Sequence, residues 1–191
     1  MDTYRTVLFL HLLALFVGFG AAAILGLSLF RLRSASTQAD ALPWSSLAGK
    51  TERAFPVAIL GLFVTGAYMT SDVWTWSTGW IDVAIVSLIV IAAQGALVAG
   101  RRAKELERTL EANGPGQLSK GARKMTCDRA LWIVSFANPG IVLGVAWVMT
   151  QKPGTMAAIA AVVIGYAVGA VTALQFAKPA AAELETVAAT G

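Results

Sequence analysis

Residues 6–30 read TVLFLHLLALFVGFGAAAILGLSLF, an apolar run in which His11 is the one ionisable side chain. A helix needs about 20 mostly apolar residues to cross the hydrocarbon core of a bilayer. The run is longer than the roughly 7–15 apolar residues of a secretory signal peptide, and Arg31 and Arg33 follow it rather than precede it. We therefore expect an uncleaved membrane-spanning helix.

Four further runs of the same character follow this helix. Hydrophobic residues make up 57% of the 191 residues and charged residues only 14%, whereas a soluble domain carries about 25% charged residues. This composition excludes a soluble enzyme, and the single cysteine excludes a disulfide-rich secreted scaffold. We predict an all-α polytopic membrane helix bundle that forms one domain over residues 1–191. Its expected spans are residues 5–30, 54–71, 80–99, 130–150 and 156–177.

Positive charge is concentrated on one side of these spans. All of the 15 Lys and Arg residues except Arg5 and Lys152 lie in the segments 31–53 and 100–129 or, as Lys178, after the last span. Cytoplasmic loops of membrane proteins are enriched in Lys and Arg. We therefore expect an N-out/C-in orientation in a bacterial plasma membrane, with residues 31–53 and 100–129 as cytoplasmic loops.

This distribution also explains the formal net charge of +4 without a nucleic-acid partner. The lipid bilayer is the expected environment, with a homo-oligomer or a membrane complex as a further expectation. Four tryptophans are expected to anchor the outer surface at the level of the headgroups, namely Trp74, Trp76, Trp80 and Trp147. Within the basic segment, RRAKELERTLEA (101–112) is expected to continue the third helix into the cytoplasm.

His11 is the main candidate for a functional side chain, because ionisable groups inside a bilayer are costly. At 1.5 Å per residue it lies roughly 9 Å below the outer boundary, and Tyr68 lies at nearly the same depth. Met69 and Met149 lie slightly nearer the outside. Imidazole binds haem iron and copper, and thioether favours Cu(I) and ferrous haem. We expect His11, Tyr68 and Met69 as cofactor-binding residues, His11 and Met149 as metal ligands, and haem b as the candidate cofactor. In the alternative interpretation, His11 gives a hydrogen bond to Tyr68 or a backbone carbonyl and fixes helix packing.

Asn138 and Pro139 lie in the middle of the fourth span. Proline removes one helical hydrogen bond, and the carbonyl that loses its partner needs another. Asn138 and Ser135 are expected to supply that partner. The pair indicates either a cavity or hinge, or a kink used only for packing.

Small and polar residues predict how the helices associate. Gly165 and Gly169 have GxxxG spacing, which favours close packing either within the chain or along a homodimer seam. Thr65 and Gln94 are expected to form hydrogen bonds between helices.

Two stretches carry a family resemblance, LHLLALFVGFG (Leu10–Gly20) and ANPGIVLGVAWVMTQKPG (Ala137–Gly154). They resemble an uncharacterised family of bacterial integral membrane proteins and, more distantly, HemJ-type protoporphyrinogen oxidases and copper-resistance D-type membrane domains. In the HemJ-type enzymes the histidine of the first helix is a haem ligand, and it corresponds to His11. The resemblance implies a small membrane protein that binds haem, or assists assembly of a membrane complex, through His11. A haem-dependent oxidoreductase and a transporter of copper or another small solute are the alternatives.

Overall fold

The computed structural model describes residues 3–177 of the chain, and Lys178 with the rest of the C-terminal segment lies outside them. Within this range the regular structure is helical, apart from one isolated β-bridge between Thr37 and Gln117. Five helical rods are long and apolar enough to cross a membrane, which confirms the predicted fold class. The rods are α1 (Thr3–Ser34); α2 (Gln38–Glu52) with α3 (Ala54–Val73); α4 (Gly79–Gln94) with the π-helix η1 (Gly95–Ala99) and α5 (Gly100–Ala112); α6 (Lys120–Thr126) with α7 (Arg129–Gln151); and α8 (Thr155–Phe176).

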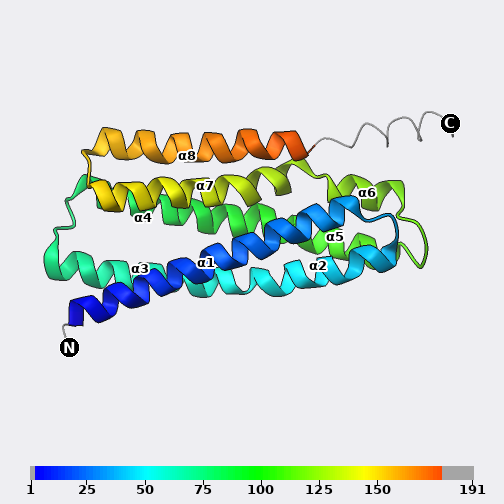
Figure 1. Ribbon diagram of the computed structural model, residues 1–191, viewed down its shortest axis with the longest axis horizontal. Helices are drawn as coiled ribbons and strands as arrows, with labels where there is room; N and C mark the ends of the chain where they lie inside the picture. Colours follow the sequence, from blue (N-terminus) through cyan, green and yellow to red (C-terminus); the bar gives the residue numbers. More distant parts are fainter. Residues whose placement is uncertain (1–2, 178–191) are drawn as a thin grey trace.

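The rods run back and forth along the long axis of the molecule (Figure 1). α1 packs on α2 and α3 to form one layer, while α4, α7 and α8 form the other. The start of α1 and the end of α8 lie at opposite ends of the bundle, as five spans require. We call the end that carries α5 and α6 the basic end, and the end with the α3–α4 and α7–α8 connections the tryptophan end.

The segment 31–53, predicted as a cytoplasmic loop, contains the helix α2. Its first turn is closed by Thr37 and Asp40: the backbone N–H of Asp40 donates to Thr37 Oγ1 at 3.2 Å, and the Thr37 hydroxyl donates to Asp40 Oδ2 at 2.7 Å. Such a reciprocal cap stabilises a helix start. α2 packs on α1 and α5 around a small core that contains Leu32, Leu106 and Leu110. The expected extension of the third span is confirmed as α5.

α7 and α8 form the most extensive helix interface in the described chain. A methyl group on Gly165 would collide with the carbonyl of Gly140, and one on Gly169 with the carbonyl of Phe136. The two backbones therefore touch where glycine leaves room for them. The GxxxG pair of α8 is thus used within the chain, as one of the two interpretations of the sequence requires.

An aromatic cluster joins α1, α7 and α8 toward the basic end. The Trp132 ring is fully buried, stacks on Phe136 and meets the edge of Phe30 at a centroid distance of 5.2 Å. Its indole N–H donates to the carbonyl of Thr126 at 3.0 Å, so that the polar atom is satisfied.

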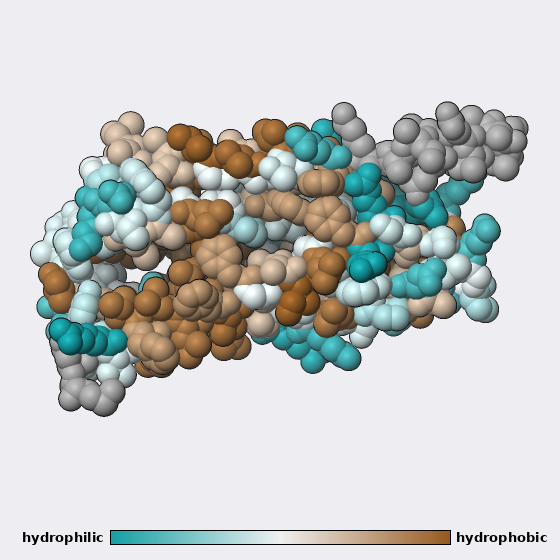
Figure 2. Space-filling model, in the orientation of Figure 1, coloured by the Kyte–Doolittle hydropathy of each residue, from teal (hydrophilic) through white to brown (hydrophobic). Residues whose placement is uncertain are grey.

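The middle of the bundle presents large apolar side chains outward, and the polar ones gather toward both ends (Figure 2). A soluble monomer rarely exposes so broad an apolar surface. The distribution is that of a multi-pass membrane protein.

At the tryptophan end, Trp74 and Trp80 pack edge to face at 5.3 Å, and Lys152 Nζ lies 4.7 Å from the centre of the Trp74 ring. Trp76 and Trp147 are about half exposed, as expected of side chains at a membrane surface. Two of the four predicted anchors therefore also hold the α3–α4 connection against the end of α7.

Candidate functional site

His11 lies buried between α1 and α3, and its Nδ1 is 2.8 Å from Thr65 Oγ1. Thr65 Oγ1 also lies 2.5 Å from the carbonyl of Gly61, to which its hydroxyl donates. When the hydroxyl proton is used there, Thr65 Oγ1 accepts from the imidazole, and a neutral His11 then carries its proton on Nδ1 and its lone pair on Nε2. Thr65 thus forms the expected bond between helices, and the partner of His11 is a hydroxyl that the sequence interpretation had not assigned to it.

Small residues allow α1 and α3 to approach each other around His11. A Cβ atom on Gly66 would lie 3.5 Å from the imidazole Cε1, and one on Gly61 only 3.1 Å from the Cβ of Ala14. This close contact and the His11–Thr65 bond together hold the first layer of the bundle.

No hydrogen bond joins His11 to the other residues predicted beside it within the described part of the chain. Tyr68 is 42% exposed and makes no hydrogen bond to His11 in the described chain. Met149 lies on α7 and is partly exposed, while Met69 is half-buried on α3. Residues 3–177 contain no group of three or more His, Cys, Asp or Glu side chains that could hold a metal ion. The grouping of His11 with Tyr68, Met69 and Met149 stays a prediction.

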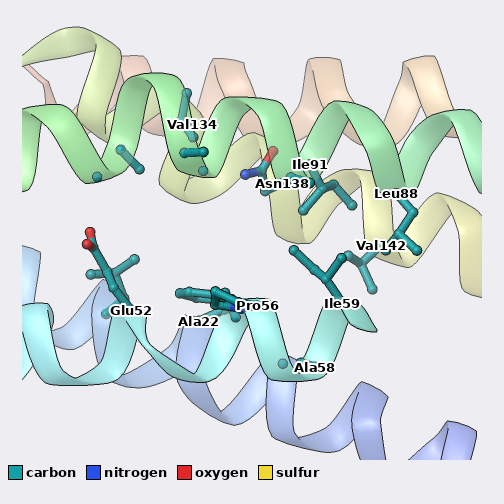
Figure 3. A pocket seen from close by; sticks show the side chains of 18 of the residues that line it. Ala22, Glu52, Pro56, Ala58, Ile59, Leu88, Ile91, Val134, Asn138 and Val142 are labelled. Carbon is teal, nitrogen blue, oxygen red and sulfur yellow. The ribbon is translucent and has the colours of Figure 1, made fainter. Parts of the chain in front are cut away.

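The two helix layers enclose a cavity of about 750 Å³ that the sequence analysis did not locate. α1 and α3 line one side, and α4, η1 and α7 line the other. Figure 3 shows Ile59 of α3 pointing across toward Leu88, Ile91 and Val142. Pockets for small molecules typically measure roughly 300–1,000 Å³ and are mostly apolar. The volume and the aliphatic lining match that class.

Polar groups enter this cavity at a few points. Glu52 of α2 directs its carboxyl group into the space between the layers, and Asn138 of α7 lies in the opposite wall (Figure 3). Glu52 Oε1, Asn138 Oδ1 and Ser135 Oγ, all from residues that line the cavity, are buried and have no hydrogen-bond partner in the described chain. Buried polar atoms without a partner are rare in native proteins, and a bound group or water is one of their explanations. The cavity therefore offers hydrogen-bonding positions to a ligand.

The same observation corrects one expectation about α7. The helix continues through Pro139, and the Ser135 hydroxyl makes no hydrogen bond, so it does not replace the bond lost at the proline. Gln94 Oε1 is also without a partner, so the structure shows no bond between helices from this atom. Asn138 and Pro139 both line the cavity, and whether the pair also serves as a hinge or as a packing kink stays a prediction.

Charged residues lie at the basic end of the cavity. Arg101 and Lys104 of α5 line it together with Glu52. The cavity is therefore amphipathic along its length.

Exposed apolar side chains of α3 and α4 border the cavity. Leu60 and Phe63 of α3 and Ile89 of α4 line it, and Leu60 and Ile89 are each 62% exposed. The cavity is therefore not sealed from the surface of the bundle, and its border at these side chains is apolar.

The π-helix η1 forms part of the wall, since Gly95, Ala96 and Ala99 line the cavity. π-helical turns inside α-helices are rare and occur frequently at functional sites. This turn lies where the apolar part of the cavity meets its charged end.

Three cavity residues were missed as site residues by sequence reasoning: Glu52, Arg101 and Lys104. The two basic residues had been assigned to orientation alone. A signal was present for Glu52, because it is an acidic residue two positions before an apolar span, in a segment with a net positive charge.

Comparisons of this chain with protein-family models, with curated proteins and with solved structures gave no match, so the family resemblance of its sequence stays a prediction.

Proposed function

We propose that this multi-pass membrane protein binds an amphiphilic small molecule of the membrane in the cavity between its two helix layers. The observation that carries the proposal is the joint character of the cavity: an aliphatic interior bordered by exposed apolar side chains of α3 and α4, a charged end at Glu52, Arg101 and Lys104, and unpartnered polar atoms in its lining. The apolar part of the ligand lies between α1, α3, α4 and α7. Its polar part lies near Glu52.

Filling the cavity tests this proposal. Ala92 lines the cavity, whereas its neighbour Ala93 is exposed and does not. Native mass spectrometry of protein purified in a mild detergent counts the lipid molecules that each protein retains. We expect wild type and Ala93→Phe to retain a lipid, and Ala92→Phe to lose it while its circular-dichroism spectrum and elution volume stay unchanged.

A second filling variant controls for a local folding defect caused by Ala92→Phe. Ala22→Phe enters the same cavity from α1, and Ala23→Phe is its exposed counterpart. Equal lipid retention by wild type and by both filling variants, all folded, would refute the proposal.

Haem binding through His11 is the second candidate, and the His11–Thr65 bond favours it. Histidines that bind metals almost always use the other ring nitrogen in a hydrogen bond, and Nδ1 of His11 is used in this way. Nε2 would then be the ligand atom. An absorbance spectrum before and after dithionite reduction decides the point: a Soret band that is lost in His11→Ala supports the proposal, and a flat spectrum after expression with ample haem refutes it. Metal analysis of the same preparation tests the copper alternative.

The N-out/C-in orientation in a bacterial plasma membrane is supported by the charge distribution of the sequence. It places the charged end of the cavity in the cytoplasmic leaflet. A reporter fused after Gly191 should then be active in the cytoplasm, and periplasmic activity would contradict the orientation.

A further inference from the structure

The charged end of the cavity combines one carboxylate with two cationic side chains. Glu52 is the last residue of α2, and its Oε1 is buried without a hydrogen-bond partner. A carboxylate withdrawn from water is costly unless a cation or hydrogen-bond donors compensate it. A ligand group that supplies both is therefore favoured at this position.

The nearby cations do not supply that compensation by direct contact. In the described chain, no ion pair within 4 Å joins Glu52 to Arg101 or Lys104. Arg102, the neighbouring cation, instead contacts Glu105 at 3.3 Å and Asp128 at 3.8 Å. Arg101 and Lys104 lie at the cavity with exposed side chains. The charged end thus presents separate negative and positive positions.

The hydrogen-bonding capacity of the Glu52 carboxylate restricts the kind of cation that fits the negative position. Glu52 Oε1 is a hydrogen-bond acceptor without a partner, on a residue that lines the cavity. A primary ammonium group carries three donors, whereas a quaternary ammonium has none. The lining therefore matches a cation that can donate hydrogen bonds.

Resting on the proposed function, we propose that the ligand is a phospholipid whose headgroup carries a primary ammonium beside its phosphate. The ammonium binds the Glu52 carboxylate, and the phosphate binds Arg101 and Lys104. One acyl chain lies in the cavity, and the other extends past the exposed apolar side chains of α3 and α4 into the bilayer. An anionic phospholipid would use only the cations and leave Glu52 uncompensated.

A competition between headgroups tests the assignment. The protein is reconstituted in nanodiscs that contain equal amounts of dioleoyl phosphatidylethanolamine, phosphatidylcholine and phosphatidylglycerol, then extracted in mild detergent and analysed by native mass spectrometry. We expect phosphatidylethanolamine to be enriched about tenfold over each of the others, the size of effect that one charge-assisted hydrogen bond supports.

Variants at the two positions should change the result in different ways. Glu52→Gln should abolish the preference for ethanolamine over choline while a lipid is still retained. Arg101→Gln combined with Lys104→Gln should reduce retention of all three lipids. Glu111→Gln removes an exposed carboxylate on α5 that does not line the cavity, and should behave as wild type.

The possible failures are distinguishable. Retention of phosphatidylglycerol above phosphatidylethanolamine, or a preference for ethanolamine that survives Glu52→Gln, would overturn the headgroup assignment and leave the cavity as a lipid site. Equal retention by wild type and by Ala92→Phe and Ala22→Phe would overturn the proposed function itself.

Discussion

Replacing Gly165 by alanine places a methyl group directly against the backbone of α7. At Gly144, in the same interface, an added Cβ would lie 2.8 Å from the carbonyl oxygen of Ala161, so the helices must part by about 0.6 Å to reach ordinary contact at 3.4 Å. At Gly165 the carbonyl of Gly140 is closer still. Overpacking of an interior costs about 1–3 kcal/mol, and a backbone carbonyl cannot rotate away as a side chain can. We therefore expect Gly165→Ala at the upper end of this range and Gly144→Ala below it.

Thermal unfolding in a mild detergent, followed by fluorescence and by the loss of the monodisperse chromatographic peak, measures these effects. A cost of about 3 kcal/mol lowers the melting temperature of a chain of this size by about 6–12 °C. The control is Gly20→Ala, because nothing lies within 4 Å of a Cβ atom at that position of α1. If Gly20→Ala lowers the melting temperature as much as Gly165→Ala, or if Gly165→Ala unfolds like wild type, the close contact between α7 and α8 is refuted.

Three further predictions concern single side chains. Trp132→Ala should lower the unfolding free energy by about 3–5 kcal/mol in the same assay, because the ring is fully buried. Trp147→Ala, at a side chain that is 47% exposed, should lower it far less. Similar losses in the two variants would contradict the burial of Trp132. Thr65→Val should lower the unfolding free energy by about 0.6–1.7 kcal/mol, as loss of the His11 bond requires, and no loss would count against that bond. Lys152 has a left-handed backbone with φ 49°, so Lys152→Ala should be about 1–2 kcal/mol less stable than Lys152→Gly, and the reverse order would contradict this conformation.

The spans were predictable because each is a long apolar run, and for such runs only a helix satisfies the backbone inside a bilayer. The helix α2 escaped prediction since its sequence, QADALPWSSLAGKTE, has no apolar run or strong periodicity. The signal that existed was local: Thr37 and Asp40 have the spacing of a reciprocal helix cap. The helix is then stabilised by packing against Leu106 and Leu110, which lie far from it in the sequence.

The candidate site was predictable only in part. His11 stood out because it is the one histidine of the chain. The structure places its side chain in a buried position. Its partner Thr65 was predicted to form a hydrogen bond between helices, but not with His11. The depth of each residue in the membrane favoured Tyr68 as the neighbour of His11. Depth alone does not reveal which face of a helix turns inward.

The cavity depends on how the layers pack, and the sequence holds no local signal for that. Glu52, Arg101 and Asn138 lie on α2, α5 and α7, and only the antiparallel arrangement of the rods brings them to one space. Asn138 and Pro139 had suggested a cavity or hinge in the fourth span, and the position of the pair in the lining agrees with the first of these.

The bundle combines closely packed helix pairs, such as α7 and α8, with a cavity between the layers. Glycine pairs hold α8 on α7, and small residues with the His11–Thr65 bond hold α1 on α3. The cavity lies in the space between these two pairs, where exposed apolar side chains of α3 and α4 border it. The proposed ligand would therefore occupy a space that neither close contact uses.

The most direct test of the account is photocrosslinking with a phosphatidylethanolamine that carries a diazirine in one acyl chain, followed by mapping of the labelled peptides. The account predicts labelled side chains inside the cavity, such as Ile59 and Val142, in addition to lipid-facing ones. Labelling of these two residues should disappear in Ala92→Phe and persist in Ala93→Phe. Labelling confined to outward residues such as Val57, Val86 and Val168 would show that no lipid chain enters the cavity, and would contradict the central claim.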